Sequence, residues 1–327
     1  MHPVTQMFDL IEGPIRFALV RWAVESKVFD HCENGISAAD LAAEIKGDVE
    51  RTNRALQALV AAEFLTYGDK KYRLRGDLAP YLLSTSKQCI NQTFLDLSQT
   101  RHAGLDQFEK LIAGARPSGI PKAFDAAHWQ RQQRSLSIFH RSVAAEVMLD
   151  ALQTVPQWQN ANSLLDLGGG STELAVDIRT LRPDMTVAVF DLPGLIENLA
   201  PMRDPGIMAY AGNYNDPQTL PSGPFDIVWC SMSLYFAEDL TATLANLSTC
   251  LNPGGTLISF HEDLSEDRCH PMRHVIGRTM PALAGQDLSF SGGFIAKTMR
   301  EVNLIIQSSK HIETPFGPFR LDVGRKD

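Results

Sequence analysis

The sequence predicts an α/β protein, in which a mostly parallel sheet covered by helices follows a smaller, mainly helical domain. Apolar runs alternate with helix-like segments from residue 163 onward, which is typical of parallel strands joined by helical crossovers. Glycines directly follow the first of these runs. Residues 1–90 instead show apolar side chains at helical spacing, followed by a short hairpin pattern.

Composition limits the class of protein. The 327-residue chain has 44% hydrophobic residues, enough for two domains with their own cores. Its net charge of −8 disfavours nucleic acid as the main partner. Neither a secretory leader nor an apolar run of membrane-spanning length is recognisable. The five cysteines lack C-x-x-C spacing, which argues against a disulfide framework and a zinc site. These features predict a cytoplasmic protein.

The first domain, residues 1–90, has the pattern of a winged helix. Apolar residues recur at helical spacing over 6–30, and Ser37 and Asp40 form a capping-box-like start of the next helix. After a third helix, two short strands are expected around a Gly-Asp turn at 68–69. Such a domain serves either in DNA binding or in dimerisation, and the acidic chain favours dimerisation.

The rest of the chain is expected to contain a helical linker and the sheet domain. Residues 91–155 are predicted to be helical and to wall a ligand pocket, with a loop at 114–121. Residues 156–327 are predicted to form the sheet domain. Its strands are expected at 163–168, 186–191, 207–212, 225–231, 255–262, 303–311 and 317–325.

The first strand leads into a turn that predicts nucleoside binding. An apolar run ends at Asp166, and Gly168 to Gly170 precede an amphipathic helix. Glycine lets such a turn approach a ligand without a Cβ in the way, and the helix start offers N–H groups to an anion. The next strand also ends in an acid, Asp191, which suits ribose hydroxyls. The alternative is an ordinary strand–helix turn that binds nothing.

Residues around the turn narrow the choice of nucleoside. Glu173 stands where a dinucleotide fingerprint requires its third glycine. The Gly-Lys-Ser/Thr ending of a phosphate-binding loop is absent. We therefore favour S-adenosylmethionine, which has no pyrophosphate and tolerates a bulkier helix start.

Five segments in order resemble the class I methyltransferases, in particular the dimeric small-molecule O-methyltransferases with an N-terminal winged-helix domain. These segments are 166–171, 190–193, 211–214, 225–228 and 251–257. The resemblance covers nearly the whole chain. It implies a Rossmann-like methyltransferase domain with a mostly parallel seven-stranded sheet and an antiparallel closing strand. It also implies a homodimer formed through the N-terminal domain.

The resemblance implies which residues hold the cofactor. In this family the glycine turn contacts the methionine part, the acid after the second strand holds ribose, and a segment after the third strand touches adenine. The corresponding residues are Asp166, Gly168, Gly170, Asp191, Leu192, Asn213, Tyr214 and Ser231. Two positions depart from the pattern. Asn213 replaces an acid, and Thr172 replaces a glycine, which either weakens cofactor binding or caps the helix.

The usual base of the family is missing. Tyr235 and Phe236 stand where these enzymes have a His-Asp pair whose histidine is the general base. The protein is therefore expected to act by proximity, to use another base, or to methylate carbon or nitrogen instead of oxygen. A related type binds iron through the missing pair, so we expect no metal here.

Several histidines are candidate replacement bases. His261 ends the fifth strand, and His270 and His274 open a helix that lines the acceptor pocket in the family. His270 and His274 share one face if that helix includes both, but a metal pair there would lack a third ligand. The alternative is that both are ordinary surface or packing residues. His140 aligns with a segment that contacts acceptor and cofactor.

We assign catalytic roles to Tyr235 and His274. Contacts to the substrate are expected from His140, Tyr235, His270, His274 and Met280. Candidates for an apolar acceptor wall, although such residues are more often core, are Met272, Met280, Phe290, Phe294 and Met299.

The predicted activity is methyl transfer from S-adenosylmethionine to a small aromatic metabolite in specialised metabolism, at oxygen. The alternatives are methylation of carbon or nitrogen, a cofactor-dependent enzyme that no longer methylates, and a DNA-binding regulator. The predicted partners are the acceptor and a second copy of the chain.

Overall fold

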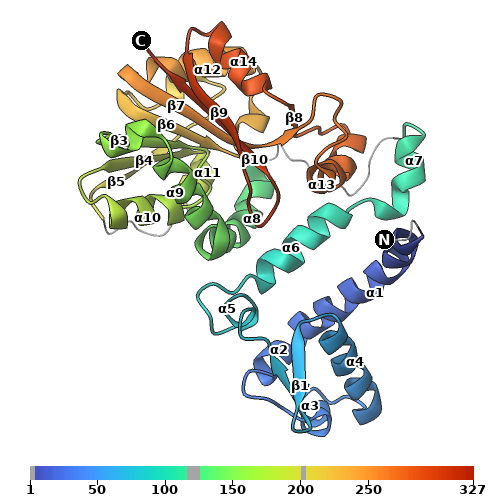
Figure 1. Ribbon diagram of the computed structural model, residues 1–327. Helices are drawn as coiled ribbons and strands as arrows, with labels where there is room; N and C mark the ends of the chain where they lie inside the picture. Colours follow the sequence, from blue (N-terminus) through green and yellow to red (C-terminus); the bar gives the residue numbers. More distant parts are fainter. Residues whose placement is uncertain (1–3, 116–125, 200–203) are drawn as a thin grey trace. The chain divides into compact units, whose positions relative to one another are not determined.

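A computed structural model describes residues 4–115, 126–199 and 204–327 (Figure 1). Its internal contacts divide the chain into two compact units, Met1–Leu95 and Asp96–Asp327. Among the helices that the structure describes, none combines the length and the apolar character needed to cross a membrane.

The first unit contains helices packed with a two-stranded hairpin. Its elements are α1 (Thr5–Glu25), α2 (Val28–His31), α3 (Ala38–Glu44), α4 (Val49–Ala61), β1 (Leu65–Gly68), β2 (Lys71–Leu74) and α5 (Ala79–Leu82). The hairpin and the three helices before it confirm the predicted pattern. Ser37 Oγ accepts the Asp40 N–H at 3.2 Å, as the capping sequence predicts. The helical spacing over 6–30 is shared by two helices, because α1 ends at Glu25 and Lys27 takes a left-handed φ of 54°.

A series of helices leads into the second unit, and the first of them, α6, begins before the division at Leu95 and ends after it. They are α6 (Asn91–His102), η1 (Leu105–Gln107), α7 (Phe108–Ile112), α8 (Ala126–Phe139), the π-helical turn η2 (His140–Ala144), α9 (Ala145–Gln153) and η3 (Pro156–Gln159). Most of the loop expected at 114–121 lies outside the described residues. The proposed separation of 91–155 from 156–327 stays a prediction, whereas the contacts place the division of the chain after Leu95.

A seven-stranded sheet forms the centre of the second unit, in the order β5-β4-β3-β6-β7-β10-β9 (Figure 1). The strands are β3 (Ser163–Leu167), β4 (Thr186–Asp191), β5 (Ile207–Ala211), β6 (Phe225–Ser231), β7 (Leu251–Leu264), β9 (Ile305–Ile312) and β10 (Phe319–Arg325). Strands β3 to β7 are parallel, and β10 is antiparallel to both β7 and β9. The predicted fold class is confirmed. A two-residue strand, β8 (Phe290–Ser291), also pairs with β7.

Helices cover both faces of this sheet, because its central strands are apolar on both sides. Leu164 and Val187 face a core shared with α9 and α10, whereas Leu165 and Ala188 face a core shared with α12 and α14. The remaining helical elements are α10 (Glu173–Leu181), α11 (Pro193–Ile196), η4 (Pro217–Thr219), η5 (Leu234–Phe236), α12 (Leu240–Thr249), α13 (Met272–Leu283) and α14 (Phe294–Glu301).

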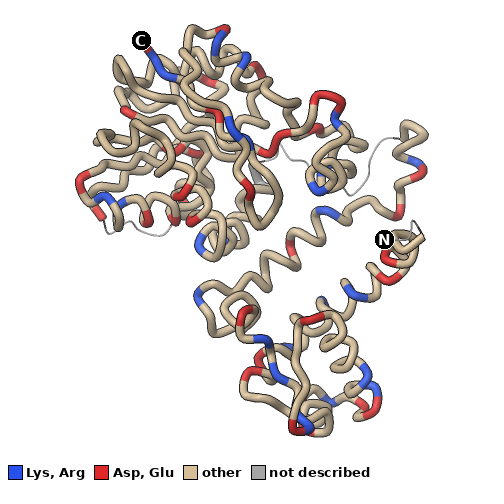
Figure 2. The backbone as a smooth tube through the Cα atoms, in the orientation of Figure 1, with Lys and Arg blue, Asp and Glu red and all other residues tan. Residues whose placement is uncertain are grey.

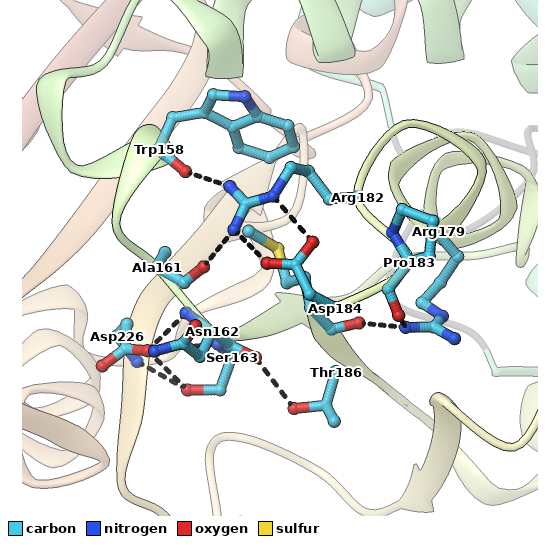
Figure 3. A network of polar contacts seen from close by, with 11 residues as sticks. Trp158, Ala161, Asn162, Ser163, Arg179, Arg182, Pro183, Asp184, Thr186 and Asp226 are labelled. Carbon is cyan, nitrogen blue, oxygen red and sulfur yellow. Dashed lines mark hydrogen bonds and ion pairs between the residues drawn. The ribbon is translucent and has the colours of Figure 1, made fainter.

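Polar contacts hold the amino ends of the central strands (Figure 3). The Arg182 guanidinium donates to the carbonyl oxygens of Trp158 at 2.7 Å and Ala161 at 3.0 Å. The Asp226 carboxylate at the start of β6 accepts the Asn162 and Ser163 N–H groups at the start of β3. This edge is occupied by structural contacts, so the opposite, carboxyl edge of the strands is the place for a ligand.

Candidate functional site

The glycine turn after β3 is closed by side chains from two other elements. Gly168 and Gly170 have left-handed φ values of 68° and 63°. A Cβ on Gly168 would lie 2.6 Å from Ser233 Cβ, and one on Gly170 would lie 2.4 Å from Leu136 Cδ2. Both positions therefore require glycine, for backbone conformation and for space.

Asp191, at the end of β4, faces this turn. Its Oδ2 accepts the Gly170 N–H at 2.8 Å, and its Oδ1 accepts the Leu192 N–H at 2.7 Å. The sequence suggested that the N–H groups of this turn would bind an anionic ligand. The Gly170 N–H is instead hydrogen-bonded to the Asp191 carboxylate. Each carboxylate oxygen still has a second lone pair that a ribose hydroxyl can use.

Asp166 is a second, more deeply buried acid beside the turn. Its Oδ2 would lie 2.7 Å from a Cβ on Gly169. Burial, and then the charge of Asp191, raise the pKa of Asp166 from 3.8 to about 7. A cation bound over the turn would favour the ionised form of this carboxyl.

Ser171 begins the helix after the turn, a role for which the sequence suggested Thr172. Ser171 Oγ accepts the Glu173 N–H at 3.3 Å, whereas Thr172 makes no side-chain capping bond. Ser171 also lies 2.8 Å from Nδ1 of His140. The capping expectation for Thr172 is wrong because its neighbour accepts the N–H that a cap would take.

His140 is buried at the start of the π-helical turn η2, a feature often found at functional sites. Burial lowers the pKa of His140 to about 4, so the imidazole is neutral near pH 7. Since Ser171 Oγ already accepts an N–H, its hydroxyl hydrogen is best assigned to His140 Nδ1. This leaves Nε2 as the protonated ring nitrogen. The predicted pocket residue thus lies beside the glycine turn.

The residues expected beside adenine differ in exposure. Asn213 is exposed and its Oδ1 accepts the Asn215 N–H at 3.0 Å. Tyr214 is buried, and its hydroxyl donates to the Ser233 carbonyl at 2.6 Å. In the described part of the chain, the buried hydroxyls of Ser231 and Ser233 have no hydrogen-bond partner. Buried polar atoms are normally paired, so these two hydroxyls are free to meet a ligand at this edge.

Tyr235 does not have the surroundings of a base. Its hydroxyl donates to the Glu262 carbonyl at 2.9 Å, and its ring stacks on Phe290 with centroids 4.9 Å apart. The Arg278 guanidinium lies 5.2 Å from the centre of the tyrosine ring. Burial is the largest cause that raises the pKa of Tyr235 well above its usual value. Its catalytic role stays a prediction, and these contacts argue for a structural one.

His261 uses both ring nitrogens within the protein. Nε2 accepts the Leu234 N–H at 3.0 Å, so Nδ1 carries the hydrogen and donates to Ser259 Oγ at 2.8 Å. Burial, and then the charge of Arg278, lower the pKa of His261 to about 3. This candidate base instead fixes the loop after β6 to strand β7.

The histidines near α13 are not on one helix face. The helix begins at Met272, after Pro271, so His270 lies outside it and is exposed. His274 is buried, with Nε2 2.6 Å from the Pro318 carbonyl and Nδ1 3.6 Å from Glu262 Oε1. The helix does not include His270, so the condition for a face shared by His270 and His274 is not met, and the catalytic role of His274 stays a prediction. Within the described ranges, no three potential ligands gather as a metal site would require.

The proposed apolar wall is only partly assembled. Met280 is buried and Phe290 stacks on Tyr235. Met272 is 76% exposed and Phe294 is 47% exposed, whereas Met299 is fully buried in the sheet core. The latter three do not form a common wall.

The sequence analysis missed several residues that the fold brings to this edge. Ser171 and Ser233 contact the glycine turn from its two sides. The Glu262 carboxylate is paired with Arg278 at 2.7 Å. The position of Ser171 beside the glycines was a usable signal, but nothing local in the sequence indicates the partners of Ser233 or Glu262.

Comparisons with known proteins agree with this architecture. A family described as "Methyltransferase domain" matches residues 128–305. OxyT, an N,N-dimethyltransferase of Streptomyces rimosus, is 26% identical over 287 residues, covering 82% of this chain and 81% of OxyT. A human bifunctional dTTP/UTP pyrophosphatase/methyltransferase protein is 24% identical over 81% of this chain, which spans only 45% of that protein's length.

Solved structures show the same fold over the full chain. An O-methyltransferase family protein from Burkholderia thailandensis has a TM-score of 0.80 at 19% identity, covering 100% of this chain and 99% of that one. Human N-acetylserotonin methyltransferase in complex with S-adenosylmethionine has a TM-score of 0.77 at 19% identity, covering 100% and 98% of the two chains. Since the matching family accounts for more than half of its residues, this chain belongs to the methyltransferase-domain family and is an S-adenosylmethionine-dependent methyltransferase of small molecules.

Proposed function

We propose that this enzyme methylates an oxygen atom of a small aromatic metabolite, with the cofactor held over the turn that Asp191 and the glycines form. The single observation that carries the proposal is the closed glycine turn with Asp191 bonded to it. Gly168 and Gly170 leave room where a Cβ would collide with Ser233 and Leu136. Asp191 would hold the ribose, and the free hydroxyl of Ser231 suits the same ligand.

The chain's own residues would position the reactants and exclude water. S-adenosylmethionine supplies a methyl group on a positively charged sulfur, which is already a good leaving group. The candidate bases have other partners: His261 is fully bonded, Tyr235 donates to a carbonyl, and His274 faces Pro318 and Glu262. The acceptor oxygen would therefore react as a readily ionised hydroxyl, by proximity rather than with a dedicated base.

Methylation of nitrogen is a second candidate, favoured by the same lack of a base. A neutral amine has a lone pair ready to attack, so it needs no proton removed beforehand. The likeness to OxyT points the same way. The two candidates are separated by incubating the enzyme with a cell extract and ¹³C-methyl cofactor. The carbon chemical shift of the transferred methyl distinguishes methoxy, N-methyl and C-methyl products.

The cofactor site is tested by calorimetric titration with S-adenosylhomocysteine. We expect micromolar binding to the wild type, lost in Asp191→Ala and kept in Asp150→Ala, an exposed acid of α9. Equal affinity in wild type and Asp191→Ala would contradict the assignment of Asp191. No binding to the wild type would contradict the proposed cofactor site itself.

We also propose that a second copy of the chain packs against the first unit. The described part of α1 exposes a large apolar surface in water. Its exposed members are Val4, Met7, Phe8, Leu10, Ile11 and Ile15. So many exposed apolar side chains in one short segment are typical of a covered interface, and an identical helix offers matching apolar side chains.

A further inference from the structure

Three arginines lie close together near the carboxyl edge of β7, where one of them is paired with Glu262. Arg273 and Arg278 lie on α13, and Arg101 lies near the end of α6, in the part of that helix that belongs to the second unit together with α13 (Figure 2 marks basic residues in blue). The Arg101 guanidinium lies against α13, with Nη1 3.2 Å from the position of a Cβ on Gly277. We call Arg101, Arg273 and Arg278 the α13 arginine cluster.

The members of the cluster have different partners. Arg278 donates to Glu262 Oε2 at 2.8 Å from Nε and lies 2.7 Å from it through Nη2. Arg273 Nη1 donates to the Pro315 carbonyl at 2.7 Å. Arg101 makes no hydrogen bond or ion pair with any residue that the structure describes. Its interaction with Glu262 is a longer-range electrostatic attraction, which is opposed by repulsion from Arg278 and Arg273.

Among the residues that the structure describes, positive charge exceeds negative charge in this cluster. Glu262 is the carboxylate paired with Arg278, and it is also the acid that acts on Arg101. The next acid, Asp263, is paired with Arg320 at 3.2 Å and lies 3.5 Å from His311. Loss of solvent, together with the charges of Arg278 and Arg273, lowers the pKa of Arg101. An added anion would therefore be stabilised beside Arg101.

A single loop links this cluster to the glycine turn. Ser233 contacts the turn at Gly168, and two residues later Tyr235 donates to the Glu262 carbonyl and stacks below Arg278. A molecule anchored at the cluster would thus have its body near the turn. The Tyr235 ring under Arg278 stacks on Phe290, and aromatic side chains suit a flat ligand.

We propose that the methyl acceptor is an aromatic acid, and that Arg101 and Arg278 bind its carboxylate. This inference rests on the proposed small-molecule methyl transfer and names its substrate class. A guanidinium has five N–H donors arranged to match a carboxylate, so Arg278 can bind a ligand while it keeps Glu262. Arg101 is exposed, and no described residue accepts a hydrogen bond from its guanidinium.

The smallest probe of this class is benzoate, with neutral benzamide as its matched control. Thermal unfolding of the full chain is followed with increasing benzoate, benzamide or inorganic sulfate, with and without S-adenosylhomocysteine. A ligand that binds the folded state raises the unfolding temperature. The variants are Arg101→Met, which keeps length but removes charge, and Arg300→Met, which removes an exposed arginine of α14.

We expect benzoate to stabilise the wild type and Arg300→Met, and benzamide to have no effect on either. In Arg101→Met the benzoate affinity should fall about tenfold, as expected for the loss of a charge-assisted hydrogen bond. Equal effects of benzoate and benzamide, or unchanged benzoate binding in Arg101→Met, would overturn the proposal. Sulfate binding as tight as benzoate binding would overturn the aromatic acid as its ligand.

The outcome is separable from that of the proposed function. Benzoate binding that depends on Arg101, without binding of S-adenosylhomocysteine, would leave the anion site in place and reject the cofactor site. Binding of S-adenosylhomocysteine without any effect of benzoate would reject the aromatic acid alone.

Discussion

The His140 imidazole is hydrogen-bonded through Nδ1 to Ser171 Oγ at 2.8 Å, which joins the π-helical turn η2 to the glycine turn. Both residues are buried. Ser171 also accepts the first free N–H of α10, so one hydroxyl links three segments of the site. The position of His140 over the turn therefore depends on Ser171.

This link predicts coupling between the two residues. Ser171→Ala and His140→Phe should each weaken S-adenosylhomocysteine binding, and the double variant should be less affected than the sum of both. The expected coupling is about 1 kcal/mol, the usual net value of one hydrogen bond. Calorimetric titration of all four proteins measures it. Strictly additive losses would show that the two side chains act independently.

A side chain in the glycine turn is expected to weaken cofactor binding, in addition to straining the backbone. Gly168→Ala places a Cβ 2.6 Å from Ser233 Cβ at a φ of 68°. Gly285 has a similar φ of 77° but nothing within 4 Å of its Cβ position, so Gly285→Ala is the matched control. Both should lose about 1 kcal/mol of stability from strain. Only Gly168→Ala should also weaken S-adenosylhomocysteine binding, by about tenfold or more. Equal binding by the two variants would contradict this.

Asp166 predicts a pH dependence of stability. Its pKa is raised from 3.8 to about 7, so the folded protein holds a proton that the unfolded chain has released. The unfolding free energy should therefore fall as pH rises from about 4 to 7. In Asp166→Asn this slope should disappear, which makes the variant about 4 kcal/mol more stable relative to wild type at pH 7.5 than at pH 4. Urea unfolding across this range, with Asp150→Asn as control, measures the difference. A slope retained in Asp166→Asn would place its origin elsewhere.

Tyr235→Phe tests whether the phenol takes part in proton transfer. The variant loses one hydrogen bond to the Glu262 carbonyl, so we expect about 1 kcal/mol less stability. Because the pKa of Tyr235 lies well above 10, the pH dependence of kcat should be unchanged. A pH profile that loses one ionisation in the variant would show that Tyr235 is a base after all.

The exposed face of α1 predicts a concentration-dependent dimer. Phe8→Glu and Ile11→Glu place a charge on residues that are 60% and 66% exposed in the single chain, so the fold of one chain should tolerate both. Sedimentation should show a dimer for the wild type and a monomer for the double variant. Glu33→Gln, on the exposed surface outside this face, is the control. A double variant that sediments as the wild type does would exclude α1 from any interface.

The sequence by itself determined the order of strands and helices and the position of the glycine turn. Alternating apolar runs, the Gly68-Asp69 hairpin turn and the Ser37 cap act over a few residues, so they can be recognised without the fold. The acids Asp166 and Asp191 were placed at strand ends by the same local reasoning, because parallel strands present their carboxyl ends at one edge.

Only the tertiary structure decided which side chains are free to meet a ligand. His261 is not free to bind a ligand because Leu234 and Ser259 are hydrogen-bonded to both of its ring nitrogens. Tyr235 is not free because its hydroxyl is hydrogen-bonded to the Glu262 carbonyl. Arg101 lies next to Gly277 of α13, far along the chain, and makes no hydrogen bond or ion pair with a described residue. Contacts between segments distant in sequence depend on how helices pack on the sheet. The spacing of residues along the chain does not predict that packing.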